Sequence, residues 1–185
     1  MTADDVRRIV LVRHAQAERE TAVDHERRLD GRGRTEASSA GRWLAESGIA
    51  PALARVSSAR RTSETWERVR AALPRAPETV HERRIYDVSV DIHRREAGID
   101  ELIAILRETP EAVGDLVVVG HNPSLHDLVD VLAVRGRDAA EDELSERVAR
   151  SGFPTAAVAV LTVDGPWRSL GPGLARMTGF WAPTG

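Results

Sequence analysis

Short aliphatic runs alternate along the chain with longer stretches whose apolar residues recur every three or four positions. The first pattern is typical of buried strands and the second of amphipathic helices. Strands are predicted, in chain order, at 8–12, 54–57, 79–81, 116–119, 156–163 and 167–170. Helices are predicted, in chain order, at 31–47, 58–73, 100–108, 123–134 and 141–151. Residues 85–89 show neither pattern and are expected to be irregular.

Strands that alternate with helices predict an α/β fold, a three-layer α/β/α sandwich around a mostly parallel sheet. No linker, repeat or low-complexity stretch interrupts the pattern, so residues 1–185 are expected to form a single domain. Ligands bind such sheets beyond the carboxyl ends of the strands. Three polar segments should therefore meet at one edge of the sheet: Arg13-His14, residues 57–61 and His121-Asn122.

The composition excludes several classes of function. The formal net charge is −3, which argues against a broadly cationic surface for nucleic acid or for an anionic membrane. Cysteine is absent, so disulfides, thiol catalysis and zinc–thiolate sites are impossible. All 26 basic residues are arginines. Any anion site must therefore use guanidinium, imidazole or backbone N–H groups.

The sequence carries no membrane or export signal. The longest aliphatic run, 156–161, is far too short to span a bilayer. The first residues are acidic and polar, unlike a secretory signal. The expected compartment is therefore the cytoplasm. The sequence does not indicate an oligomeric state.

The polar segments at the three strand ends suit a phosphate group. They supply His14 and His121, and Arg13 with Arg60 or Arg61. Guanidinium groups match phosphate oxygens in fork geometry. A neutral imidazole is a competent nucleophile near pH 7, and a second, protonated one can stabilise charge. Taken singly, Arg13-His14 is more often a surface pair, His121-Asn122 is often only a helix entry, and Arg60 and Arg61 could be solvated charges. Their convergence favours a phosphate site.

Three segments resemble the signatures of a known family: residues 11–15 (Leu-Val-Arg-His-Ala), 57–65 (Ser-Ser-Ala-Arg-Arg-Thr-Ser-Glu-Thr) and 119–123 (Val-Gly-His-Asn-Pro). They are similar to those of the histidine phosphatase superfamily, whose fold is called phosphoglycerate mutase-like. Residues 85–89 and 117–123 look most like the short bacterial protein phosphohistidine phosphatases.

The middle signature of that family is a Ser, an Arg four residues later and a Thr four residues after that. Ser57, Arg61 and Thr65 satisfy this spacing. The resemblance therefore assigns Arg61 to the phosphate pocket and leaves Arg60 as its solvated neighbour.

The resemblance implies a mechanism without metal or cofactor. His14 attacks phosphorus and becomes phosphohistidine, while Arg13, Arg61 and His121 hold the phosphoryl oxygens. Asn122 joins them in binding substrate. A carboxylic acid protonates the leaving group and then activates water. Asp87 lies where the family's acid usually falls, and Glu82 is the alternative.

Two departures bear on the substrate. Ala15 stands where the first signature usually has Gly, so that turn must use ordinary backbone angles. The mutases and sugar bisphosphatases carry an Asn near the place of Glu20, in a longer chain with an inserted lid. This chain lacks both that Asn and the inserted lid, which favours phosphohistidine on a protein as the substrate. The alternatives are small phosphate esters, such as sugar or nucleotide phosphates, and a phosphate-binding module without turnover.

Two further histidines receive ordinary interpretations. His25 lies in a charged stretch and is expected to be solvated. His121 and His126, beside Asp127, are five residues apart at a helix start and do not share a face, which argues against a metal site.

Overall fold

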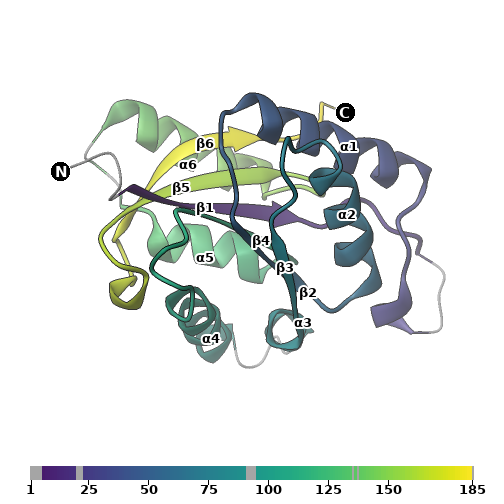
Figure 1. The fold of residues 1–185 in the computed structure, drawn as a ribbon, viewed down its shortest axis with the longest axis horizontal. Helices are drawn as coiled ribbons and strands as arrows, with labels where there is room; N and C mark the ends of the chain where they lie inside the picture. The colour runs from purple at the N-terminus through teal and green to yellow at the C-terminus, as the bar shows by residue number, and fades with distance from the viewer. Residues whose placement is uncertain (1–5, 20–22, 91–94, 135, 137, 185) are drawn as a thin grey trace.

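A six-stranded sheet runs through the molecule (Figure 1). The computed structural model describes residues 6–19, 23–90, 95–134, 136 and 138–184. The strands are β1 (Val6–Arg13), β2 (Leu53–Ser57), β3 (Glu78–Glu82), β4 (Asp115–Gly120), β5 (Val158–Asp164) and β6 (Ala175–Trp181), in the spatial order β3-β2-β4-β1-β5-β6. The pairs β3·β2, β2·β4 and β4·β1 are parallel, whereas β5 is antiparallel to β1 and to β6. The predicted mostly parallel sheet is confirmed.

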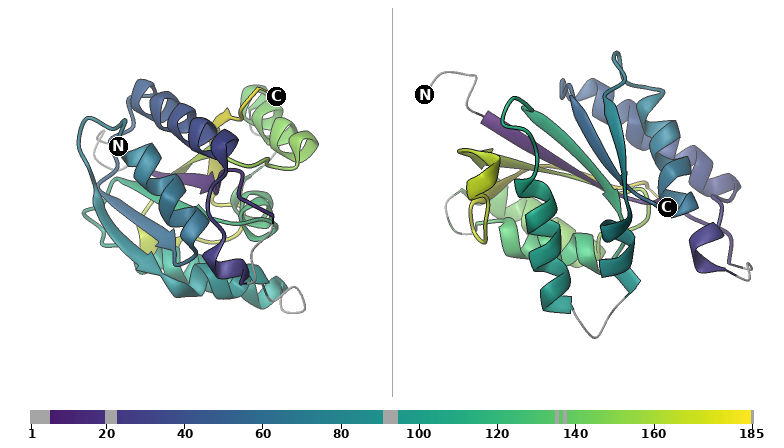
Figure 2. Two further views of the ribbon diagram at one scale, coloured as in Figure 1. Left: turned by 90° about the vertical axis from the view of Figure 1, so that its right-hand side faces the viewer. Right: turned by 60° about the horizontal axis from the view of Figure 1, so that its bottom comes forward.

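Helices cover both faces of the sheet. They are α1 (Gly31–Glu46), α2 (Arg60–Arg70), α3 (Arg83–Val90), α4 (Arg95–Arg107), α5 (Ser124–Leu132) and α6 (Ala139–Ser151), with short 3₁₀ turns η2 (Asp24–Glu26) and η4 (Trp167–Ser169). Helices α1 and α2 lie on one side of the sheet, and α4 and α5 on the other (Figure 2). This is the predicted three-layer sandwich. Within the described ranges, no helix combines the length and apolarity needed to cross a membrane.

The alternation of side chains along β1 builds two separate apolar layers. Val10 and Val12 pack with α1 and α2, where Trp66 is fully buried. Ile9 and Leu11 face the opposite layer, which includes residues of α4 and α5. All four strand residues are fully buried, as expected for a strand covered on both faces. The sheet is therefore a rigid platform for whatever follows its strands.

The loop after β1 is held against the start of α1. Asp30 caps α1 by accepting a hydrogen bond from the backbone N–H of Gly33 at 2.7 Å, and its own N–H donates to the Gln16 carbonyl at 3.1 Å. A Cβ at Gly33 would collide with the backbone of Gln16. Glycine therefore allows the loop that follows the first strand to lie directly on the helix.

Two predicted strand assignments near the C-terminus need correction. Residues 167–170 do not form a strand, because Trp167 opens a 3₁₀ turn after Pro166 and is fully buried, donating its indole N–H to the Val113 carbonyl at 2.7 Å. The strand that pairs with β5 on the side away from β1 is β6, which the sequence did not predict. Its alternation is broken beside Gly179, where the register shifts between Val160 and Leu161.

Two helix predictions also need correction. Residues 85–89 belong to the regular helix α3, not to an irregular segment. Ile85 and Val88, three residues apart, both pack on the main apolar cluster, which outweighs the low helix propensity of this β-branched stretch. Helix α2 begins at Arg60, capped by Ala59 without a side-chain bond, because the hydroxyl of Ser58 is used elsewhere.

Candidate active site

The carboxyl ends of β1 and β4 lie side by side, with Arg13 opposite Gly120 in the parallel register. The next residues are His14 and His121, and the backbone N–H of His14 donates to the Gly120 carbonyl at 3.0 Å. Strand β2 ends beside them at Ser57, whose hydroxyl lies 2.7 Å from His121 Nε2. The three predicted polar segments therefore do meet at one edge of the sheet.

The His14 ring has a defined tautomer and a low pKa. Its Nδ1 lies 2.8 Å from the Ala15 carbonyl, which can only accept, so Nδ1 carries the proton and Nε2 keeps its lone pair. Burial, together with the charges of Arg61, Arg13 and Arg27, lowers the pKa of His14 to about 3, although the hydrogen bond to the Ala15 carbonyl acts in the opposite direction. The imidazole is therefore neutral at physiological pH. Ala15 is buried and adopts no positive φ, as its replacement of glycine required.

His121 lies beside His14, with ring centroids 5.2 Å apart. Burial, followed by Coulomb interactions with the neighbouring groups His14, Arg61 and Arg13, holds the pKa of His121 well below its ordinary value. The second imidazole is therefore neutral before an anion binds. A phosphate dianion would favour its protonation through Coulomb attraction.

The middle signature presents three side chains to the site. Ser57 contacts His121, as above. Arg61 is 5% exposed, whereas the side chain of Arg60 remains 39% exposed and pairs with Glu64 at 2.9 Å. Thr65 donates to the Arg61 carbonyl at 2.6 Å and accepts from the Ala15 N–H at 3.0 Å. Spacing of four residues places Arg61 and Thr65 on one helical face, so α2 is tied to the turn after His14.

Arg13 and Asn122 share a backbone anchor. Arg13 Nη1 donates to the Phe153 carbonyl at 2.9 Å, and Asn122 Nδ2 donates to the same carbonyl at 3.0 Å and to that of Gly152 at 2.9 Å. Phe153 adopts φ 48°, the left-handed region that side chains disfavour. This strained turn aims one carbonyl at two predicted site residues.

Several buried donors of the site have no partner. Across the part of the chain that the structure describes, Arg13 Nε, Arg61 Nε and His121 Nδ1 are inaccessible to solvent and make no hydrogen bond. Buried polar groups are normally paired, and each unpaired one costs about 1–3 kcal/mol. Three such nitrogens on the predicted phosphate-binding residues form a set of donors suited to anionic oxygens.

The sequence analysis missed Asp24. Arg61 Nη1 donates to its carbonyl at 2.8 Å and Nη2 to its carboxylate at 3.1 Å, and the Tyr86 hydroxyl also donates to that carboxylate at 3.1 Å. Burial raises the pKa of Asp24, but hydrogen bonds from Arg27, Arg61 and Tyr86 outweigh burial and leave the pKa below its ordinary value. Asp24 lies in a 3₁₀ turn and does not follow a strand. Apart from its carboxylate, the sequence therefore contains no signal that it belongs to the site.

The two predicted acids, Asp87 and Glu82, pair with arginines outside the signature segments. The side chain of Asp87 is 54% exposed and pairs with Arg83 at 3.6 Å. Glu82 accepts from Arg84 at 2.7 Å and lies 3.5 Å from Arg55. The hydrogen bond from Arg84 lowers the pKa of Glu82. This bond favours the ionised carboxylate, which has no proton to donate. Neither carboxylate has a hydrogen bond or ion pair with the four signature side chains among the described contacts.

Tyr86 and His25 complete the rim of the site. The Tyr86 ring lies 5.8 Å from the His121 ring and 4.8 Å from the His25 ring, centroid to centroid. His25 Nε2 lies 3.0 Å from the Ser58 hydroxyl. The sequence analysis expected His25 to be solvated because its neighbours are charged. The structure instead packs its ring against Tyr86 at the rim of the site. Glu20, the position compared with the mutases, lies outside the described residues.

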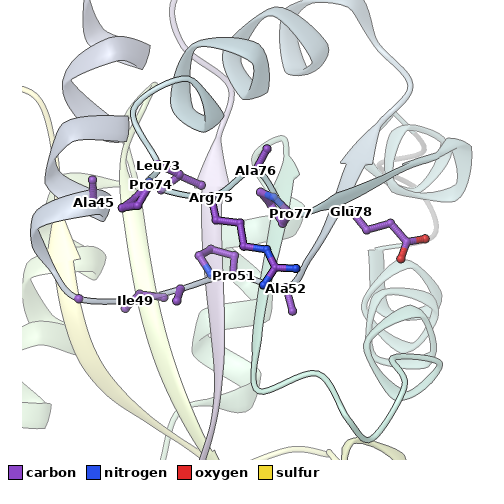
Figure 3. A pocket seen from close by; sticks show the side chains of 12 residues that line it. Ala45, Ile49, Pro51, Ala52, Leu73, Pro74, Arg75, Ala76, Pro77 and Glu78 are labelled. Atoms are coloured by element: carbon purple, nitrogen blue, oxygen red, sulfur yellow. The ribbon is translucent and has the colours of Figure 1, made fainter.

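Two cavities lie at opposite ends of the sheet. An open hollow of about 460 Å³ is lined by His25, Ser58, Arg83 and Tyr86, beside the histidines. A cavity of about 500 Å³ lies before β2 and β3, at their amino ends, and is mainly apolar, with Pro51, Pro74 and Pro77 in its wall (Figure 3). Its lining contains no histidine, whereas the first hollow is lined by His25 and by Tyr86, whose ring contacts His121.

The residues that the structure describes contain no cluster of three His, Asp or Glu side chains arranged to hold a metal ion. The site offers positive and neutral donors around His14, which suit an anion better than a cation. Metal-independent chemistry stays a prediction.

Known proteins place the chain in a family. A sequence model described as "Histidine phosphatase superfamily (branch 1)" matches residues 9–91. An uncharacterized protein of Mycobacterium tuberculosis is 33% identical over 174 residues, which cover 93% of this chain and 99% of that relative. The chain belongs to the histidine phosphatase superfamily.

Solved structures of this superfamily share the fold. A candidate phosphohistidine phosphatase SixA from Nakamurella multipartitia superposes with a TM-score of 0.74 at 25% identity, covering 97% of this chain and 98% of that one. The protein histidine phosphatase SixA complexed with tungstate gives 0.67 at 21% identity, with 94% and 95% covered. These superpositions establish the phosphoglycerate mutase-like fold that the sequence predicted.

Proposed function

We propose that this histidine phosphatase superfamily member is a phosphohydrolase that works through phosphohistidine on His14. The observation that carries the proposal is the juxtaposition of a free Nε2 lone pair on His14 with unpartnered donors of Arg13, Arg61 and His121. Phosphoryl transfer depends mainly on positioning and on electrostatic stabilisation, which this arrangement supplies. Asn122 braces Arg13 through their shared carbonyl and contributes to substrate binding.

The proposed reaction has two steps. In the first, His14 Nε2 forms a bond to phosphorus while the bond to the leaving group breaks, and a carboxylic acid gives its proton to the leaving group. In the second, the same carboxylate takes a proton from water, whose oxygen attacks phosphorus as the N–P bond breaks. Phosphate leaves and His14 is restored. Asp87 is proposed as the acid, with Glu82 as the alternative.

The proposed substrate is phosphohistidine on a protein. Two observations support this choice over small phosphate esters. The structures described as SixA superpose with TM-scores of 0.74 and 0.67, against 0.55 for a mycobacterial glucosyl-3-phosphoglycerate phosphatase. The hollow lined by His25, Ser58, Arg83 and Tyr86 is open to solvent. A side chain projecting from a protein surface can enter such a hollow. We place the reaction in the cytoplasm and propose that it needs no metal.

The intermediate provides the first test. Wild-type protein is mixed with ³²P-labelled aryl phosphate, with EDTA present throughout, and quenched rapidly. We expect a base-stable, acid-labile phosphoenzyme, and none in His14→Ala. His81→Ala, which alters an exposed histidine of β3, is the matched control and should label normally. Labelling of His14→Ala, or loss of label with EDTA that Mg²⁺ restores, would contradict the proposal.

The substrate provides the second test. Single-turnover rates are compared for a histidine-phosphorylated protein and a panel of sugar and nucleotide phosphates. We expect the protein substrate to react fastest. A sugar or nucleotide phosphate that reacts faster would reassign the enzyme to small esters, and a protein that binds phosphate without turnover would be a binding module.

A further inference from the structure

A series of ring contacts leads outward from the nucleophile. The His14 ring lies beside His121, His121 beside Tyr86, and Tyr86 beside His25, with centroid separations of 5.2, 5.8 and 4.8 Å. The last two pairs meet edge to face. The series connects the residues that act on phosphorus to the open hollow of about 460 Å³.

The wall of this hollow is a built structure. Its residues come from η2, the turn between β2 and α2, and α3. The His25 ring is held at both nitrogens, by the Ser58 hydroxyl at 3.0 Å and the Glu26 carboxylate at 3.1 Å. The Tyr86 hydroxyl is fixed on Asp24 at 3.1 Å. Both rings are thus oriented before any ligand arrives, which reduces the entropy that binding must overcome.

Tyr86 lies next to two groups predicted to hold the phosphoryl oxygens. Its ring contacts the His121 ring, and the Arg61 guanidinium carbon lies 6.0 Å from its centroid. Tyr86 also lines the open hollow. A group bonded to a phosphoryl group held by Arg61 and His121 can therefore extend past Tyr86 into that hollow.

We propose that the hollow lined by His25, Ser58, Arg83 and Tyr86 is the leaving-group subsite, and that it selects planar-ring leaving groups. This inference rests on the proposed function. Aromatic rings attract other planar rings edge to face or in offset stacks, with a gain that flexible alkyl groups do not obtain. Ser58 and Arg83 keep the rim polar, which suits the peptide around a histidine side chain. The imidazole of phosphohistidine is a leaving group of this kind.

The experiment compares the two chemical steps in Tyr86→Leu. The kcat/KM of phosphoenzyme formation is measured by rapid quench with a phosphohistidine peptide, nitrophenyl phosphate and glycerol phosphate, and each rate is divided by the wild-type rate. We expect losses of about tenfold for both ring substrates and no loss for glycerol phosphate. Hydrolysis of the preformed phosphoenzyme should be unchanged, because the leaving group has already departed.

Further variants separate the ring from other contributions. Tyr86→Phe keeps the ring but removes the bond to Asp24, and should retain the preference for ring substrates. His25→Leu should reduce that preference by a smaller factor. Val90→Ala, at an exposed position of the same helix, controls for general perturbation of α3.

The outcomes are distinct. Equal losses for all three substrates, or slower phosphoenzyme hydrolysis, would show that Tyr86 acts on the phosphoryl group and overturn the subsite. Unchanged rates for the ring substrates in both Tyr86→Leu and His25→Leu would also overturn it. Failure of wild type to form a phosphoenzyme with any substrate would instead refute the proposed function.

Discussion

Strand β1 carries an arginine at each end of its pairing with β4, and the two arginines have different partners. At the amino end, Arg8 faces Asp115 and donates two hydrogen bonds to its carboxylate, at 2.6 and 2.7 Å. At the carboxyl end, Arg13 faces Gly120, which has no side chain. Arg13 reaches only a backbone carbonyl, and its Nε has no partner among the described residues.

The difference distinguishes an arginine that stabilises the fold, Arg8, from one that is predicted to bind an anion, Arg13. Asp115 also accepts the Ala50 N–H at 3.0 Å, so the amino-end pair joins two strands and a loop. Its donors and acceptors are matched internally, which lowers the cost of burial. At the carboxyl end Arg13 Nε and His121 Nδ1 have no such partner among the described residues, and an anion from outside would offset the cost of burying them. Substitutions at the amino end should therefore change stability, and those at the carboxyl end should change turnover.

The largest expected effect concerns the acid. Asp87→Asn should slow phosphoenzyme formation from an alkyl phosphate by about 10²- to 10⁴-fold. It should hardly affect nitrophenyl phosphate, whose leaving group needs almost no proton. The single-turnover burst must be measured, since hydrolysis of phosphorylated His14 needs an activated water with either substrate. Glu82→Gln is the matched comparison. A leaving-group-dependent loss in that variant would transfer the role to Glu82, and equal losses for both substrates in Asp87→Asn would remove it from Asp87.

The second effect separates two neighbouring arginines. Arg61→Ala should lower the rate of phosphoenzyme formation by about 10²-fold, as expected when one preorganised donor is lost. Arg60→Ala should change it little, because adjacent helical side chains point about 100° apart and Arg60 pairs with Glu64. Single-turnover kinetics on both variants decide the matter. If Arg60→Ala is the more damaging change, the wrong arginine has been assigned.

The third effect tests the amino end. Asp115→Ala leaves Arg8 and the Ala50 N–H without their partner, and should lower the free energy of unfolding by about 2 kcal/mol, since the pair is partly exposed. Urea unfolding measures this loss, and rapid quench should show unchanged phosphoenzyme formation. The comparison between the two ends breaks down if Arg61→Ala destabilises the protein as much, or if Asp115→Ala impairs turnover.

The smallest expected effect is a flat pH profile. With the pKa of His14 at about 3, the imidazole stays neutral, and an NMR titration of its ring should show no inflection near the ordinary histidine value of about 6.5. The burst rate is a poorer measure, because a phosphate monoester itself titrates near pH ~6. Folding stability, in contrast, should depend on pH. An unfolded His14 takes up a proton as pH falls through about 6.5 while the folded one does not, so folding stability declines below that pH. A His14 ring that titrates near pH 6.5 in the folded protein would contradict the low pKa.

Strand-end residues were predictable because parallel strands force them together. The rule that ligands bind beyond carboxyl ends placed Arg13, His14 and His121 at one edge without any knowledge of contacts. Asp24 and Tyr86 escaped because no local pattern records their contacts. Asp24 reaches Arg61 from a 3₁₀ turn, and Tyr86 lies on a helix whose β-branched sequence argues against helix formation.

Strand β6 was missed for a different physical reason. Its inward-facing residues, Ala175, Met177 and Phe180, do not keep a strict period of two, since the strand bulges beside Gly179. Pairing with β5 supplies the hydrogen bonds that decide its conformation, and a window of sequence contains no information about that partner. Trp167 misled the analysis in the converse way, because a large apolar side chain can be buried from a 3₁₀ turn as well as from a strand.

Because the donors at the carboxyl edge of the sheet favour an anion, the stability of the folded protein should depend on the anion concentration around it. A ligand that binds only the folded chain adds stability that grows with its concentration, roughly 2.7 kcal/mol at a hundred times its dissociation constant. Inorganic phosphate, the product of the proposed reaction, would bind beside Arg13, Arg61 and His121. It would then act as an inhibitor and as a folding ligand at once. Phosphate starvation would leave the enzyme most active and most exposed to proteolysis, and phosphate abundance would leave it slower and longer-lived.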